Sequence, residues 1–218
     1  MNLSILFLGK KKDEHCQKAL KFLEKNFDSV VAFLGDWGDV QPQELDNWSG
    51  DYIVSYLSRW IVPEKLIKRA RKAAINFHPA SPEFPGIGCN NFALYQNTKE
   101  YGVTCHHMNQ VIDSGSIIAV KRFPILPNDG VEMLLQKTYD NQLVLLYEIM
   151  SKVVLGLELP ISNETWTRKP FTRKEFNELF RISPEMNDDE VQRRIRAVSY
   201  KNWQPFLDIH GFKFEYKP

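Results

Sequence analysis

Short apolar runs rich in β-branched residues alternate with a segment of helical periodicity along the first third of the chain. Residues 3–8, 30–34, 52–57 and 74–77 each form a run typical of a buried strand. Residues 13–27 place apolar side chains three or four positions apart, as an amphipathic helix does. This alternation predicts an α/β fold with a mostly parallel, twisted sheet and helices on both faces.

Two helices in this part of the chain are indicated by the residues at their starts. Asp13 is placed to accept hydrogen bonds from the free N–H groups of the first turn of the segment 13–27. Pro63 begins a segment that runs to Ala74, and proline suits the first turn of a helix. We therefore predict helices over both segments.

The pattern changes in the second half of the chain. Residues 117–123 predict another strand, and residues 130–155 predict a long helix with a break near Asp140. Residues 160–170 are mostly polar, with Trp166 among them, and predict a loop that leaves the main domain.

A small C-terminal part is expected after this loop. Residues 188–197 begin with acidic and end with basic side chains, which suits the dipole of a helix. Residues 206–216 alternate around Gly211 and predict a β-hairpin. We therefore divide the chain into a main domain over residues 1–159 and an extension over residues 160–218 with a helix and a β-hairpin.

Charge and composition argue against several classes of protein. The 28 Lys and Arg residues balance 27 Asp and Glu residues, so no strong field attracts nucleic acid. The chain has no apolar stretch long enough to span a bilayer, and its first residues lack the order of a secretory signal. The three cysteines form no CxxC pair, and an odd count suits a reducing compartment. We expect a cytoplasmic protein with no nucleic-acid or membrane partner.

Side chains able to carry chemistry stand at the ends of predicted strands. Asn76 and His78 follow the run 74–77 within Asn-Phe-His-Pro, and Asp113 comes 35 residues after His78. Ligands of parallel sheets bind beyond the carboxyl ends of the strands, where Asn76 and His78 are expected. An amide, an imidazole and a carboxylate can together polarise a carbonyl, stabilise an oxyanion and move a proton.

Three alternative roles are open to residues in this part of the chain. A metal site built from His78, His106, His107 and Asp113 is disfavoured, because no HxxxH or HExxH spacing is present and adjacent histidines on a strand point to opposite sides. The segment 86–88 lacks the third glycine of a dinucleotide-binding loop. Asp113 could also cap a turn, since it stands within Ile-Asp-Ser-Gly.

The spacing of these motifs resembles that of the folate-dependent formyltransferases over most of the chain. The family signature is Asn-x-His-Pro, then Gly-[Val/Thr]-[Thr/Ser]-x-His, then Asp seven residues after that histidine. Residues 76–79, residues 102–106 and Asp113 match it. The resemblance implies a Rossmann-like formyltransferase fold, catalytic roles for Asn76, His78 and Asp113, and 10-formyltetrahydrofolate as co-substrate, with no metal.

The same resemblance implies two binding regions. In the family, the loop after the third predicted strand lines the pterin pocket. Here this loop comprises Ser58, Arg59, Trp60 and Ile61. The block that begins at Pro79 is one residue shorter than the commoner family pattern, as in the nucleotide-sugar N-formyltransferase branch. This similarity implies that Pro79, Glu83 and Gly86 shape the acceptor side.

The implied reaction is formyl transfer to the amine of a nucleotide-linked amino-dideoxysugar, such as a dTDP- or GDP-4-amino-4,6-dideoxyhexose, for O-antigen or other surface polysaccharide. A member that acts on tRNA would be expected to carry a larger β-barrel domain, and only some 60 residues follow Leu159. Methionyl-tRNA or a purine-pathway ribonucleotide as acceptor, or a catalytically silent folate- or sugar-nucleotide-binding module, are the alternatives. Related sugar formyltransferases are usually dimers through the C-terminal region, which implies a homodimer here.

Overall fold

The computed structural model describes residues 3–217, and six strands within them form one sheet in the order β2-β1-β3-β4-β5-β6. The strands are β1 (Ser4–Lys10), β2 (Ser29–Gly35), β3 (Gly50–Tyr56), β4 (Ala70–His78), β5 (Glu100–His107) and β6 (Ile117–Pro124). The first four strands are parallel, and β5 and β6 are antiparallel to their neighbours. The predicted mostly parallel sheet is confirmed.

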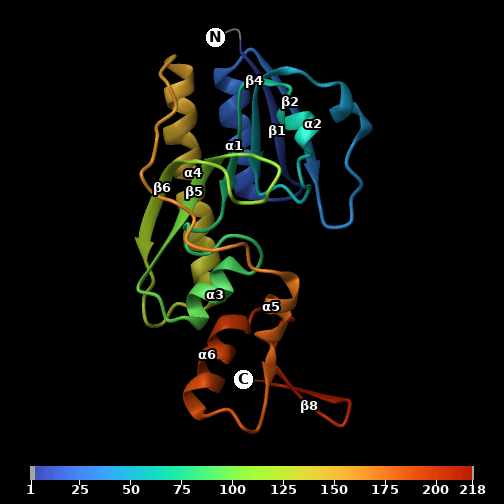
Figure 1. Cartoon of the computed structure of the whole chain (residues 1–218), viewed down its shortest axis with the longest axis vertical. Coiled ribbons are helices and arrows are strands. Elements are labelled where there is room, and N and C mark those ends of the chain that lie inside the picture. Colours follow the sequence, from blue (N-terminus) through green and yellow to red (C-terminus); the bar gives the residue numbers. More distant parts are fainter. Residues whose placement is uncertain (1–2, 218) are drawn as a thin grey trace.

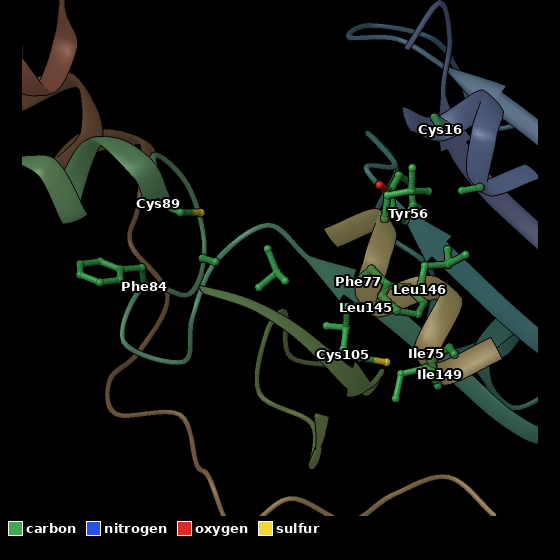
Figure 2. Packing of buried hydrophobic residues seen from close by; sticks show 14 of the residues in the cluster. Cys16, Tyr56, Ile75, Phe77, Phe84, Cys89, Cys105, Leu145, Leu146 and Ile149 are labelled. Carbon is green, nitrogen blue, oxygen red and sulfur yellow. The ribbon is translucent and has the colours of Figure 1, made fainter. Parts of the chain in front are cut away.

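The central strands β1 and β3 are buried on both faces, as expected when helices cover a parallel sheet on its two sides. Along β1, Ile5 and Phe7 join the larger core, whereas Leu6 and Leu8 join the smaller one. The larger core contains α1 (Glu14–Asn26) and α4 (Val131–Val154), and the smaller one contains η1 (Gln43–Asn47) and α2 (Glu64–Ile67). Figure 2 shows side chains of α4 beside those of β4 in the larger core.

The start of α1 follows the sequence prediction, and two other predicted helices differ from the structure. The Asp13 carboxylate accepts a hydrogen bond from the Cys16 N–H at 3.1 Å, so the predicted cap is confirmed. The helix predicted over residues 63–74 is wrong in length, because it ends at Ile67 and β4 starts at Ala70. Backbone pairing of residues 70–74 with β3 overrides the helical preference of their alanines. α4 has no break near Asp140.

A second, smaller sheet of β7, β8 and β9 lies in the C-terminal part, which Figure 1 shows in orange and red at the end of the molecule where α3 lies. The sheet consists of β7 (Arg181–Ile182), β8 (Phe206–Ile209) and β9 (Phe212–Glu215). The helices in this part of the molecule are α3 (Cys89–Tyr95), α5 (Arg173–Glu178) and α6 (Asp188–Val198). The Asn91 side chain donates to the Ala197 carbonyl at 2.6 Å, which joins α3 to α6. The predicted hairpin is present, with positive φ at His210 and Gly211 in its turn.

The loop between α4 and α5 contacts the main domain along its course to the C-terminal part. We call residues 159–171 the crossing segment. The Ser162 N–H donates to the Ile117 carbonyl at 3.1 Å, and the Thr167 N–H donates to the Pro82 carbonyl at 3.3 Å. These backbone bonds hold the crossing segment against β6 and the loop that follows β4. No helix within residues 3–217 is both long and apolar enough to cross a membrane.

Candidate active site

The three predicted catalytic residues meet where β4 and β5 pair and the β5–β6 loop returns. Asn76 and His78 lie at the end of β4, and Asn76 stands opposite His106 of β5 in the strand register. Asp113 lies in the β5–β6 loop with a left-handed φ of 45°, a conformation that aspartate tolerates better than most residues. This conformation is of the kind that clusters at functional sites.

The Asp113 carboxylate is held by several groups at once. Its Oδ2 lies 3.3 Å from His78 Nδ1 and accepts the Gly86 N–H at 2.9 Å, and its Oδ1 lies 3.5 Å from His106 Nε2. Burial alone would raise the pKa of Asp113, but His78, His106 and the Gly86 amide outweigh it and hold this pKa at about 2. Asp113 is therefore ionised at neutral pH.

His78 is a buried ring between two acceptors. Its Nε2 lies 3.1 Å from the Phe84 carbonyl oxygen, and its Nδ1 faces Asp113. Burial lowers the pKa of His78, and the Asp113 charge offsets part of that effect. A neutral ring carries one N–H and can satisfy only one of these acceptors, whereas a protonated ring satisfies both. The surroundings of His78 therefore suit a group that accepts a proton during a reaction.

The Asn76 amide is oriented by His106. His106 Nδ1 lies 2.8 Å from the His107 carbonyl, which only accepts, so Nδ1 carries a proton. Nε2 of the same ring lies 3.1 Å from Asn76 Nδ2 and 3.5 Å from Asp113 Oδ1. An amide group has two N–H bonds, so one remains for a ligand in the cavity. This arrangement suits a donor to a carbonyl oxygen or an oxyanion.

These residues line a cavity of about 490 Å³ together with the loop that follows β3. Its lining includes both predicted groups. One comprises Asn76, His78, Asp113, Pro79 and Gly86, and the other comprises Ser58, Arg59, Trp60 and Ile61. Leu57 turns the chain into this loop with a φ of 54°. The Trp60 indole N–H donates to the Asp39 carbonyl at 2.9 Å, and the Arg59 guanidinium lies 4.7 Å from the Trp37 ring.

Glu83 is the predicted binding residue that the structure does not bring to the cavity. Its carboxylate accepts a hydrogen bond from the Arg122 guanidinium at 2.9 Å. The same guanidinium bonds Glu164 of the crossing segment and lies 3.5 Å from Glu100. Arg122 binds Glu83 because β6 brings the guanidinium beside it, and no sequence motif indicates this pairing.

Two further residues of the site were not among the predicted catalytic or binding residues. His106 belongs to the motif over residues 102–106, and the register of two neighbouring strands brings it opposite Asn76. The Trp166 ring lies edge-on to His106 and His78, with ring centres 5.0 Å and 5.8 Å apart. No local signal marks Trp166, because the contact arises where the crossing segment folds back. No group of three or more His, Cys, Asp or Glu side chains within residues 3–217 is placed to hold a metal ion.

The fold and the cavity define an α/β protein with an amide, an imidazole and a carboxylate at the carboxyl end of its central strands. Residues 17–150 match the family described as formyl transferase. The chain belongs to the formyl transferase family.

Relatives by sequence include enzymes with different acceptors. A methionyl-tRNA formyltransferase of Levilactobacillus brevis is 26% identical over 83% of this chain and 59% of its own length. A GDP-perosamine N-formyltransferase of Brucella melitensis is 25% identical over 79% of this chain and 66% of its own length. The chain spans only 51% to 59% of the length of the methionyl-tRNA formyltransferases that it matches.

Solved structures share the fold over nearly the whole chain. A sugar N-formyltransferase from a Shewanella species has a TM-score of 0.79 at 18% identity and covers 99% of this chain and 97% of its own. An N-formyltransferase from Helicobacter canadensis, in complex with folinic acid and dTDP-3-aminofucose, has a TM-score of 0.74 at 20% identity, with 97% and 86% covered. At these identities, the likeness establishes a common fold.

Proposed function

We propose that this protein is an enzyme that transfers the formyl group of 10-formyltetrahydrofolate to the amine of a nucleotide-linked amino-dideoxysugar. The observation that carries the proposal is a single cavity lined both by Asn76, His78 and Asp113 and by the loop of residues 58–61. The fold matches that of sugar N-formyltransferases over nearly the whole chain, including its C-terminal part, and this match favours a sugar acceptor. A dTDP- or GDP-linked 4-amino-4,6-dideoxyhexose, used for surface polysaccharide, is the acceptor that we propose.

The residues of the cavity suit each step of this reaction. The acceptor amine adds to the formyl carbon and creates a tetrahedral oxyanion, to which the free Asn76 N–H donates. His78 accepts the proton that the amine loses, and the ionised Asp113 stabilises the resulting imidazolium. The bond between the formyl carbon and N10 of the folate then breaks, and His78 returns the proton to N10. The products are the N-formyl sugar and tetrahydrofolate.

The two groups of lining residues bind different substrates in this proposal. Ser58, Arg59, Trp60 and Ile61 hold the pterin, and Pro79 and Gly86 border the sugar. The Arg59 Nε atom is buried without a hydrogen-bond partner within the described residues, so it is available to a ligand acceptor. The folate is a co-substrate that leaves after each turnover.

The test is an assay of the full chain with 10-formyltetrahydrofolate and each amino-sugar nucleotide, read by mass spectrometry. The acceptor should gain one formyl group while tetrahydrofolate appears in equal amount. His78→Ala and Asn76→Ala should each lower kcat by roughly two to three orders of magnitude and still bind folate. The control is His210→Asn, at the hairpin turn, where asparagine tolerates the φ of 52°. Formylation of charged initiator tRNA, with no amino sugar converted, would overturn the proposal.

We further propose that the protein is a homodimer whose contact lies in the extension, residues 160–218, next to a catalytic domain over residues 1–159. The hairpin exposes large apolar side chains, with Phe212 71% and Phe214 57% accessible. A two-stranded hairpin is marginal by itself, and burying these rings against a second copy would stabilise it. Three buried free cysteines suit a reducing compartment, which supports the cytoplasm as the location.

Sedimentation of the full chain tests this association. The intact protein should sediment as a dimer at micromolar concentration, and the double variant Phe212→Ser, Phe214→Ser should sediment as a monomer. Val40→Ser serves as control, because Val40 is an exposed apolar residue (89% accessible) in the loop after β2. A monomeric intact chain would refute the dimer.

A further inference from the structure

The crossing segment brings one indole against both imidazoles of the candidate site. The Trp166 ring stands nearly perpendicular to His106, at 89°, and to His78, at 71°. Both histidines line the cavity and Trp166 does not. The indole therefore contacts the imidazoles from a side that does not line this cavity.

Several bonds fix the position of this indole. Its N–H donates to the Gly115 carbonyl at 2.7 Å, within the loop that carries Asp113. Next to it, the Thr167 N–H donates to Pro82, and the Phe171 N–H donates to the Pro85 carbonyl at 2.8 Å. The crossing segment is thus joined both to the loop that carries Asp113 and to the chain that follows His78.

The site needs such a support, because the two imidazoles must keep a defined orientation. Each has one nitrogen directed at Asp113, and rotation of either ring would break these contacts. An edge-on aromatic neighbour restricts ring rotation and also excludes water from the face that it covers. The titratable groups that face His78 are Asp113 of the β5–β6 loop, His106 of β5 and Cys89 at the start of α3, whose sulfur lies 3.8 Å from Nε2.

We propose that Trp166 is a positioning residue, whose indole holds the rings of His78 and His106 in place and keeps water from their outer side. The consequence for turnover rests on the proposed formyl transfer, whereas the consequence for the histidines does not. Loss of the indole would let water reach His78. Because burial lowers the pKa of this ring, access to water would raise it.

The first experiment follows the histidine rings by NMR in the substrate-free full chain, with His78→Asn and His106→Asn used for assignment. In Trp166→Leu, the titration midpoint of His78 should rise by roughly half a pH unit or more. In Trp166→Phe, which keeps an aromatic edge and loses the bond to Gly115, the midpoint should stay closer to that of the unaltered protein. Trp203→Leu is the matched control, because Trp203 packs on Phe176 and Phe180 of the extension.

The second experiment measures kcat and KM against pH for the same variants. Trp166→Leu should lower the plateau kcat about tenfold, since small errors in orientation are costly, and leave KM for the folate nearly unchanged. The acidic side of its pH profile should move upward with the NMR midpoint. Unchanged histidine titrations in Trp166→Leu, or a shift in Trp166→Phe as large as in Trp166→Leu, would overturn the positioning role. If no acceptor is converted by the unaltered protein, the NMR result still decides the proposal for Trp166.

Discussion

Gly86 is the backbone position at which the candidate site and the crossing segment meet, and alanine there should weaken both. Its φ of +92° lies in the left-handed region that favours glycine. A Cβ atom at this position would lie 2.6 Å from both the N and the O atoms of Phe171. These are backbone atoms, so no change of rotamer can relieve the clash. The Gly86 N–H also donates to Asp113, so displacement of this residue reaches a carboxylate of the candidate site.

The cost of Gly86→Ala can be worked out from these contacts. A left-handed conformation costs a non-glycine residue roughly 1–2 kcal/mol. The clash should break the two bonds of Phe171, in which its N–H donates to Pro85 and its carbonyl accepts from Ile87. Each such bond contributes about 1 kcal/mol net. The free energy of unfolding should therefore fall by about 3–4 kcal/mol, a large part of the ~5–15 kcal/mol of a typical protein.

Gly38→Ala separates the two contributions. Gly38 has a φ of +86°, close to that of Gly86, and a Cβ atom there would meet nothing within 4 Å. The free energy of unfolding of Gly38→Ala should fall only by the roughly 1–2 kcal/mol that a left-handed conformation costs alanine. Urea unfolding followed by circular dichroism gives both values, and kcat should fall roughly tenfold or more in Gly86→Ala through the misplaced Asp113. Equal losses of stability in the two variants, or full activity of Gly86→Ala, would refute this reasoning.

Three further predictions concern proton transfer, the crossing segment and the thiols. If the neutral His78 ring accepts the proton, kcat/KM should fall as the pH drops through the pKa of His78, which burial places below 6.5. A kcat/KM that falls as the pH rises between about 6 and 8 would contradict this role. Arg122→Leu should lower the free energy of unfolding by about 1 kcal/mol, because it leaves Glu83 and Glu164 without their cation. Lys68→Leu should change this free energy little, and equal effects of the two substitutions in urea titrations would refute the contribution of Arg122. Burial raises the pKa of Cys16 and Cys89 to about 12 and that of Cys105 further. A thiol reagent should therefore react with these cysteines only when the protein unfolds, and rapid labelling of the folded protein would disprove their burial.

Local signals were sufficient for much of the fold and for the central residues of the site. The apolar runs at 3–8 and 52–57 identified buried strands, because a strand covered on both faces must be apolar at successive positions. Asp13 identified the start of α1 through capping, which involves only neighbouring residues. Asn76 and His78 stood at the end of a predicted strand, and the geometry of parallel sheets places such residues where ligands bind.

Tertiary contacts decided the remaining features. The segment after Pro63 has helical composition, but its second half is in β4 because β3 offers a complete ladder of backbone hydrogen bonds. Glu83 pairs with Arg122, and Trp166 reaches His78 and His106, across separations of 39 to 88 residues in the chain. Contacts at such separations form only when the elements between them have packed, and no residue pattern within one element encodes them. The sequence by itself determined the strands with the strongest apolar runs and placed reactive groups at the end of one of them, and the packed fold alone decided which neighbours orient those groups.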